Sequence, residues 1–390
     1  MKKLVLLLAL AACDNGFRPE TRVVDLRILG ERSTPADLAP GETARLDALL
    51  VDPSMSTPPS LLWIGCDPDP YNQNRSPCAD SNVLADPTAL TGTSGTLPPG
   101  VSIIGFDDQA SYAVSAHLFD PLAADDPIRQ TGTIGLVLGF AVAETVSPTA
   151  TPDELQAVFA RAQAKTIKSI ISLFRIHISE SPERNHNPVP VALLVDGVAW
   201  PANAFVGVLP GSVHTFDVTA TPDSFEPYTQ ITPAGPVAQT EKIQIAWYST
   251  AGLLSQTDTQ LDSNVKPDFT APSANDAKNP LPDKPAITLW TTLRDSRGGQ
   301  SWKSWKAWLC DPTLPSPVVI GVDWPATATD PVVLHGEHLE NVLDFIVDGA
   351  ALEHGAFSPG NGTWEGTLPA GTPVGSSRGV PTSKNCAPTR

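Results

Sequence analysis

The sequence predicts a mainly β protein of tandem β-sandwich modules with one connecting helix. Short apolar runs with period-2 alternation recur along the chain, and turn residues separate them, which is the pattern of half-buried strands. The 40 prolines and 28 glycines are spread along the chain, as expected for many short strands joined by turns. A length of 390 residues suits two or three domains of about 100–150 residues each.

The first module is expected over residues 22–146. Its apolar residues alternate with charged ones, as Leu46, Ala48 and Leu50 do with Arg45 and Asp47, so one face of each strand is expected in a core. This pattern and the turns between the runs predict a sandwich of about a hundred residues. The predicted strands are 22–29, 44–51, 61–66 and 134–143.

One helix is predicted after the first module, over residues 147–165. Thr151 and Glu154 have the spacing of a capping box, and Pro152 stands at the first helical position. Arg161 and Lys165 lie toward the C-terminal end, where positive charge favours the helix dipole. We expect this helix to be a connector packed beside the first module.

The second module is expected over residues 166–312. Two apolar runs flank Asp196 and Gly197, which is a strong hairpin signal. The polar stretch 255–285, rich in Pro, Asn and Asp, predicts a long surface loop. The other predicted strands are 166–179, 215–220, 242–249 and 285–294.

A small third module is expected over residues 315–390. Three apolar runs predict its strands, at 318–322, 331–336 and 345–352. A unit of this size has a marginal core, so a covalent bridge would stabilise it.

The N-terminus predicts export and a lipid anchor. Lys2 and Lys3 precede an apolar run at residues 4–12, too short to span a bilayer, which is typical of a secretory signal peptide over residues 1–12. The Leu-Ala-Ala-Cys sequence ending at Cys13 resembles the lipobox of bacterial lipoproteins, which implies acylation of Cys13 and a tether over residues 13–21. The expected location is the bacterial cell envelope, with inner and outer membrane both left open.

Charge and composition exclude several classes of partner. Without Lys2 and Lys3 the chain keeps 23 basic against 42 acidic residues, a net charge of −19. Such a surface repels nucleic acid and anionic headgroups, so a nucleic-acid partner is excluded. The sequence has no Gly-rich phosphate loop and no Cys-x-x-Cys pair, so no cofactor is expected.

The cysteines predict two disulfides. An even number remains once Cys13 carries lipid, and in an exported chain that favours disulfides over metal binding. Cys66 and Cys78 bracket one short loop, which makes them the simplest pair and leaves Cys310 with Cys386. Four cysteines allow three connectivities, so the alternatives stay open at this point.

Short motifs give the chain a family resemblance. The first module, with its Pro-Gly-Glu-Thr turn at residues 40–43 and Trp-Ile-Gly-Cys at 63–66, resembles the Ig-like modules of bacterial envelope proteins. The third, through residues 332–339 and 345–349, is similar to the IPT/TIG immunoglobulin-like family. The whole chain resembles a family of myxobacterial cell-envelope lipoproteins, through residues 185–188, 247–252 and 293–302. This resemblance implies Ig-like modules in the envelope and carries no activity.

One aromatic segment is the main candidate for a ligand surface. Trp302, Trp305 and Trp308 are interleaved with Lys303 and Lys306, and such a set can stack on glycan rings. In a strand Trp302 and Trp308 share one face and Trp305 points to the other, so at least one face is expected in the core. A glycan- or peptidoglycan-binding module using this segment is therefore the alternative function.

Two sets of residues are weak candidates for metal sites. His335, His338 and His354 could gather three imidazoles, which would suit a metal-dependent envelope hydrolase, but their spacing is not that of a metalloprotease helix. Oxygen ligands at residues 67–74 could take Ca²⁺, although the loop lacks the glycine and distal glutamate of an EF-hand.

The leading expectation is a lipid-anchored envelope protein that is not an enzyme. Gly375, Ser377 and Gly379 match the Gly-x-Ser-x-Gly pattern, but they lie in a Pro/Gly/Ser-rich tail without the strand and helix that a nucleophile elbow needs. No other catalytic arrangement stands out. We expect a binding, adhesion or scaffolding component whose partner is the membrane, through its lipid, and an envelope protein or glycan.

Overall fold

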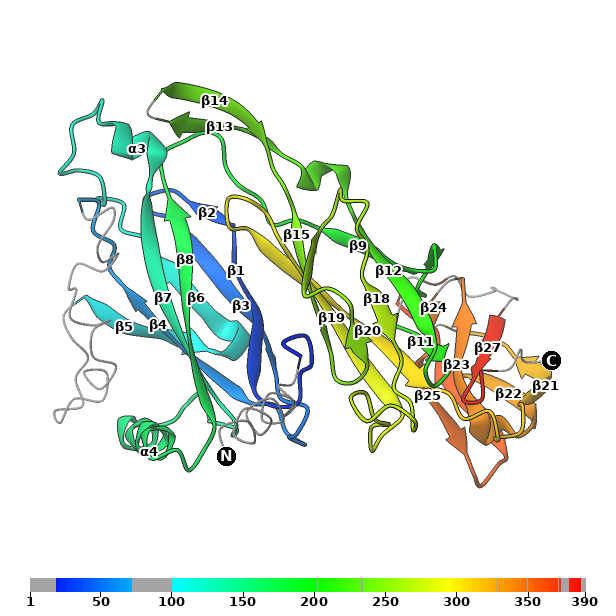
Figure 1. Cartoon of the computed structure of the whole chain (residues 1–390). Helices are drawn as coiled ribbons and strands as arrows, with labels where there is room; N and C mark the ends of the chain where they lie inside the picture. The colour runs from blue at the N-terminus through cyan, green and yellow to red at the C-terminus, as the bar shows by residue number, and fades with distance from the viewer. Residues whose placement is uncertain are drawn as a thin grey trace, which may run out of the picture.

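The structure is a computed structural model that describes residues 19–71, 100–201, 203–232, 234–327, 329–348, 350–370, 372 and 379–386. Three β units stand in a row (Figure 1). We call them module one (27–178), module two (190–309) and module three (318–383). The predicted class, mainly β with tandem sandwiches, is confirmed. None of the helices described is long and apolar enough to cross a membrane.

Module one packs a three-stranded sheet, β1-β3-β6, on a five-stranded sheet, β2-β8-β7-β4-β5. Trp63, Leu46 and Phe119 are fully buried in its core. The first strand begins five residues later than predicted, and Val23, buried before it, bonds to Ser249 of module two instead of joining a ladder. The elements are β1 (Arg27–Thr34), β2 (Asp37–Leu38), β3 (Thr43–Val51), β4 (Ser60–Cys66), β5 (Val101–Phe106), the 3-10 turn Asp107–Gln109, β6 (Ala110–Ala113), α3 (Pro127–Thr131), β7 (Thr133–Val142), α4 (Pro152–Gln163) and β8 (Ser169–Ile178).

Strand β8 corrects the predicted boundary at residue 166. It does not open module two, because it pairs with β7 of module one in an antiparallel ladder running from Val142↔Ser169 to Thr133↔Ile178. The helix before it returns the chain to the same sheet and does not carry it to the next module. Module one therefore ends near residue 179.

The helix α4 itself follows the prediction. Thr151 and Glu154 form the full capping box, with Glu154 N donating to Thr151 Oγ1 at 3.3 Å and Thr151 N donating to Glu154 Oε2 at 2.7 Å. Its apolar side packs on module one, where the rings of Phe159 and Phe140 lie 4.7 Å apart. The helix covers the outer face of the five-stranded sheet near Phe140.

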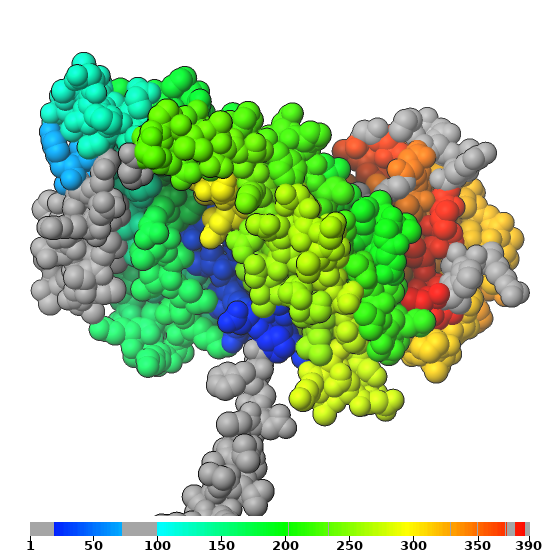
Figure 2. Space-filling model, turned by 45° about the horizontal axis from the view of Figure 1, so that its top comes forward, coloured from blue at the N-terminus to red at the C-terminus, as the bar shows by residue number. Residues whose placement is uncertain are grey.

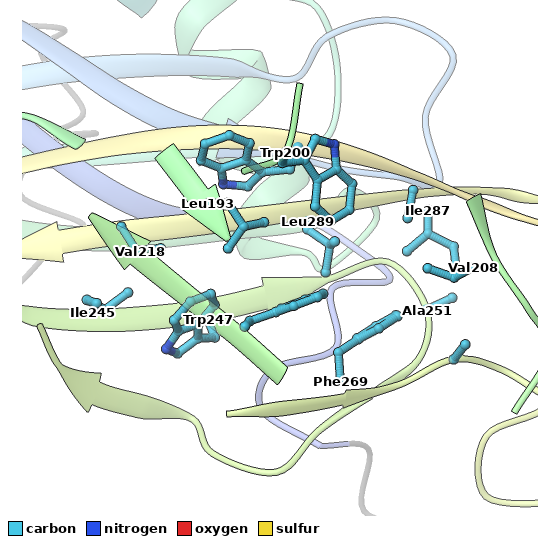
Figure 3. Close-up of a cluster of buried hydrophobic side chains, with 14 of the residues drawn as sticks. Leu193, Trp200, Val208, Val218, Ile245, Trp247, Ala251, Phe269, Ile287 and Leu289 are labelled. Atoms are coloured by element: carbon cyan, nitrogen blue, oxygen red, sulfur yellow. The ribbon is translucent and has the colours of Figure 1, made fainter. Parts of the chain in front are cut away.

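Module two has two five-stranded sheets, β10-β9-β12-β18-β16 and β11-β20-β19-β15-β17, and a separate hairpin, β13-β14. Its elements are β9 (Pro190–Val195), β10 (Val198–Ala199), β11 (Phe205–Val208), β12 (Val213–Ala220), the 3-10 turn Pro222–Ser224, β13 (Pro227–Thr232), β14 (Gly235–Thr240), β15 (Gln244–Ser249), β16 (Leu253–Leu254), β17 (Asp258–Gln260), β18 (Asp268–Thr270), β19 (Ala286–Arg294) and β20 (Gln300–Leu309). Aromatic and aliphatic side chains from both sheets fill the space between them, among them Trp200, Trp247 and Phe269 (Figure 3).

Two details of module two bear on the predictions. The hairpin at Asp196 and Gly197 is confirmed, with both residues at positive φ and Val198 paired to Val195. The long surface loop predicted at 255–285 is only partly a loop. Thr259 and Phe269 are buried there, and each lies in a short strand that extends one of the sheets, β17 and β18.

Module three is a small sandwich of sheets β21-β22-β26-β25 and β24-β23-β27. Trp364 and Phe345 are the large side chains of its core. The predicted strands 318–322 and 331–336 are present as β21 and β22, whereas the predicted run 345–352 is divided between two paired strands, β23 and β24. The elements are β21 (Val318–Asp323), β22 (Val332–Glu337), the 3-10 turn Leu339–Asn341, β23 (Val342–Val347), β24 (Ala350–Ala351), β25 (Glu353–Ser358), β26 (Thr363–Thr367) and β27 (Gly379–Ser383).

Candidate functional site

The tryptophan segment forms the C-terminal two thirds of β20. Period-2 alternation holds as predicted, because Trp305 lies on the core side and Trp302 and Trp308 lie on the other. Trp305 is only 5% exposed, its ring centroid is 6.5 Å from that of Trp200, and its Nε1 donates to Thr291 Oγ1 at 3.4 Å. Trp305 is therefore a core residue and no part of a ligand surface.

Trp302 lies at the junction of modules one and two. The guanidinium carbon of Arg32, on β1, is 4.6 Å from its ring centroid, a cation–π contact. The indole also closes on β1 at Gly30, where a Cβ would lie 3.1 Å from Trp302 Cε3. Thr292, opposite Trp302 in the ladder, donates from Oγ1 to the carbonyl of Leu29 at 3.1 Å. Module one thus packs on the outer face of β19 and β20.

Trp308 lies at the junction of modules two and three. Its ring meets that of Phe205 edge-on, with centroids 5.7 Å apart, and Lys384 Nζ lies 5.8 Å from the indole. The two lysines of the segment also cap rings: Lys303 Nζ is 5.0 Å from the ring of Trp305 and Lys306 Nζ is 5.5 Å from that of Phe205. The three indoles serve three separate packing sites, which corrects the hypothesis of one stacking platform.

Asp344 makes the junction of modules two and three sensitive to pH. Its Oδ2 accepts from the backbone N–H of Phe205 at 2.6 Å, and burial raises the pKa of this carboxyl to about 6. Since the pKa in the unfolded chain is about 4, the folded state holds more protons between about pH 4 and pH 6, and stability falls as pH rises through that window.

The variant Asp344→Asn tests this effect. It keeps an oxygen acceptor for Phe205 and removes the titration, so we expect its melting temperature to fall less than that of the wild type between about pH 4 and pH 6. Thermal unfolding of both proteins across this range measures the difference between their melting temperatures. The other carboxylates titrate in both proteins, so their contribution cancels in this difference. A gap between the two curves that does not change with pH would contradict the role of Asp344.

The disulfide between Cys310 and Cys386 is present as predicted, with their Cα atoms 5.6 Å apart. It ties the end of β20 to the segment after β27. Cys66 is also disulfide-bonded, but its expected partner Cys78 lies outside the described residues, so that pairing stays a prediction.

The histidines proposed as metal ligands are not brought together. His335 pairs with Asp323, with 2.8 Å between Nε2 and Oδ2, and His338 lies 3.4 Å from Glu340. His354 is exposed on β25, which β26 separates from the strand of His335. Among the residues described, no three His, Cys, Asp or Glu side chains are placed to hold a metal. The hydrolase hypothesis loses its candidate site.

Several of the predicted site residues lie outside the part of the chain that the structure describes. Cys13, the signal peptide and Ser377 are not described, and neither are residues 72–74 of the possible calcium loop. In the described part of that loop, Asp69 Oδ1 accepts from the backbone N–H of Tyr71 at 2.9 Å, which is a local turn contact. Calcium binding there stays a prediction.

Two of the motifs that carry the family resemblance meet at the junction of modules one and two. From residues 185–188, Asn185 Nδ2 donates to Asp295 Oδ1 at 3.3 Å, and Asn187 Oδ1 accepts from the backbone N–H of Gln300 at 2.8 Å. Asn187 Nδ2 donates in turn to the carbonyl of Ser33 in module one at 2.7 Å. The short chain between the modules is thereby fixed to both.

A buried charge network surrounds this link. Asp37 of module one accepts from the backbone N–H of Asn185 at 3.0 Å and faces His177 at 3.4 Å. Burial alone would lower the pKa of His177, but the hydrogen bond and charge of Asp37 raise it overall. Beside them Arg297 donates to Glu241 at 2.6 Å and also to Glu226. Sequence reasoning missed this role, because the partners are about 110 residues apart in the chain.

A polar pocket of about 550 Å³ opens beside this junction on module two. It lies where β15 begins and where β17 and β19 end. Figure 2 shows the β19–β20 turn, in yellow, set back in the hollow between module one and the yellow-green surface of module two. Its lining is almost entirely polar: Lys242, Gln244, Asp258, Thr259, Gln260, Val265, Arg294, Asp295 and Ser296. Arg294, Asp295 and Ser296 belong to the segment 293–302 that carries the family resemblance, and no motif marked the other lining residues in the sequence.

No family model and no curated protein matches the chain. Among solved structures, it is similar to the Bacteroides ovatus mixed-linkage glucan utilization locus protein SGBP-B in complex with a mixed-linkage heptasaccharide, at 14% identity over 51% of this chain and 46% of that one, with a TM-score of 0.17. It is also similar to Escherichia coli alpha-2-macroglobulin (15%, 83% and 25%, TM-score 0.18) and to three N-terminal domains of the bacteriophage RB49 capsid protein Hoc (9%, 88% and 86%, TM-score 0.18). The chain spans about half or less of the first structures that it matches. Likeness at this level carries no functional argument.

Proposed function

We propose that the protein is a lipid-anchored, non-enzymatic component of the bacterial cell envelope that holds three β-sandwich modules as one rigid unit for binding or scaffolding. The observation that supports it best is that both junctions between modules are closed by packed side chains and hydrogen bonds. Modules in tandem normally move relative to one another unless the interface between them is extensive and well packed.

The first junction joins modules one and two along a whole strand face. Strand β1 lies on β20 through Trp302 and Arg32, and Trp290 packs with Val23 and Leu29 in a small buried cluster of its own. Asn187 then bridges the two modules with its side chain. A hinge here would have to expose apolar surface and break buried hydrogen bonds together, which is costly.

The second junction joins modules two and three by covalent and non-covalent contacts. The Cys310–Cys386 disulfide lies beside the edge-on pair of Phe205 and Trp308. The backbone adds the bond from Asp311 N to Lys384 O at 3.0 Å. Such a unit suits a protein that holds a partner at a set distance from the membrane, and an envelope protein or glycan is the partner we expect.

The lipid anchor is tested by metabolic labelling with radioactive palmitate. Cys13 is the only residue that the lipobox reading allows to be acylated, so Cys13→Ala should lose all label and no longer sediment with membranes. The matched control Asp14→Ser keeps the cysteine and should label like the wild type. Equal labelling of Cys13→Ala and wild type would overturn the anchor.

A further inference from the structure

We propose that the polar pocket of module two binds a carboxylate-bearing sugar unit of an acidic glycan through Lys242 and Arg294. This inference rests on the proposed function as an envelope binding protein and names the class of its ligand. The pocket volume of about 550 Å³ lies in the usual range for small-molecule sites.

The β-sheet register builds the floor of the pocket. Gln244 on β15 lies directly opposite Arg294 on β19 and opposite Gln260 on β17, so the three side chains form a row across three strands. All three are exposed, while their chain neighbours Ile245 and Leu293 are buried in the core. The row is therefore rigid at its base and open at its tips, which is the arrangement that a preorganised polar site needs.

Two cations of the pocket, Lys242 and Arg294, are available to bind an anion. Among the described residues, neither Lys242 nor Arg294 forms an ion pair, although the chain has 42 acidic and only 25 basic residues. The lining also holds two carboxylates. Asp258 accepts from Gln244 Nε2 at 2.8 Å and from Thr257 Oγ1 at 2.9 Å, and the buried Asp295 accepts from the backbone N–H groups of Arg297 at 2.9 Å and Gly299 at 2.8 Å. Two unpaired cations thus face one hollow.

Glu31 of module one lies close enough to Arg294 for their charges to interact. Burial raises the pKa of the Glu31 carboxyl overall, and this effect is larger than that of the positive charge of Arg294, which lowers the pKa. Glu31 Oε1 accepts from the Ser172 hydroxyl at 2.5 Å. The Glu31 carboxylate is therefore hydrogen-bonded within module one, and among the described residues it forms no ion pair with Arg294.

The other groups of the pocket fit a ligand rich in hydroxyls. A guanidinium binds a carboxylate as a planar fork, and the amides of Gln244 and Gln260 can each donate to one hydroxyl and accept from another. Val265 is the one aliphatic side chain in the lining. Nucleic acid is disfavoured by the net charge of −17, whereas a glycan with carboxylates spaced one per sugar can place a single carboxylate at Lys242 and Arg294.

The test is isothermal titration calorimetry of the full chain in detergent with tetragalacturonic acid. We expect this acid to bind and its methyl ester, which has the same sugars without charge, to bind at least about tenfold more weakly. Arg294→Gln should weaken binding of the acid about tenfold, and Lys242→Gln should weaken it less, because an ammonium lacks the fork. The control Lys284→Gln removes an exposed charge at the opposite end of β19 and should bind like the wild type.

Three outcomes would overturn the proposal. These are no binding of tetragalacturonic acid, equal binding of its methyl ester, and tighter binding of tetraglutamate, which would make the pocket a peptide site. Each variant is titrated only if its melting temperature equals that of the wild type. Weaker binding then reports loss of the site and not loss of the fold. Palmitate labelling at Cys13 reads the envelope function separately, so failure here leaves that result intact.

Discussion

Replacing Trp305 with alanine should lower the free energy of unfolding of module two by about 3–5 kcal/mol. The indole is 5% exposed and belongs to the largest buried cluster of that module, between Trp200 and the β19 strand. Alanine would leave a cavity that the surrounding rings cannot fill, and Thr291 would lose the hydrogen bond from Trp305 Nε1. Chemical denaturation, followed by circular dichroism, measures the change.

Trp308→Ala is the matched control within the same strand. Its indole is half-buried against Phe205, so its removal should cost clearly less than removal of Trp305. The opposite order, with Trp308→Ala the more damaging, would contradict the assignment of Trp305 to the core. A stable Trp305→Ala protein that lost binding to envelope polysaccharide would return this indole to the ligand surface.

The alternation of β20 shows what can be predicted from sequence. Period 2 alone places Trp305 on one face and Trp302 with Trp308 on the other, because consecutive side chains of a strand point to opposite faces. What covers the outer face depends on how modules pack, and the partners Arg32 and Phe205 lie far away in the sequence. From the sequence, the face of Trp302 and Trp308 is therefore a candidate for a free aromatic surface. In the structure Trp302 lies at the junction of modules one and two, and Trp308 lies at the junction of modules two and three.

The error at β8 has a similar cause. Local signals identified α4 and its capping box correctly, since capping depends on four consecutive residues. Whether a helix links two modules or two strands of one sheet depends on the ladder that the next strand joins. The pairing of β8 with β7 is a long-range contact that no local pattern encodes.

The pocket of module two could not be found from sequence for the same reason. Gln244 and Gln260 are common surface residues without a motif, Arg294 lies in a motif that indicated no pocket, and only the register of β15 with its two neighbours brings the three into one row. The Asn-His-Asn-Pro and Asp-Ser-Arg-Gly-Gly segments did carry a signal. Asn185 of the first segment donates to Asp295 of the second, and Asn187 accepts from the backbone N–H of Gln300. The role of both segments is therefore structural.

Removing the second disulfide should destabilise module three by about 4 kcal/mol, because the bridge closes a loop of 76 residues and so restricts the unfolded chain. The double variant Cys310→Ser with Cys386→Ser is the cleanest form, since it leaves no free thiol. All strands of module three lie between these two cysteines, so the loss should fall mainly on that module. Hydrogen exchange followed by mass spectrometry resolves the three modules within one protein.

The backbone contacts of the junction sharpen the expected pattern. Cys310 N still donates to Val208 O at 2.9 Å without the bridge, and the edge-on rings of Phe205 and Trp308 still pack, so module two should keep its protection. Reduction of the wild type by dithiothreitol should reproduce the loss in module three, and dithiothreitol should not change that module further in the double variant. An equal loss of protection in all three modules would show that they unfold as one cooperative unit, and unchanged exchange in module three would show that its core of Trp364 and Phe345 is sufficient without the bridge.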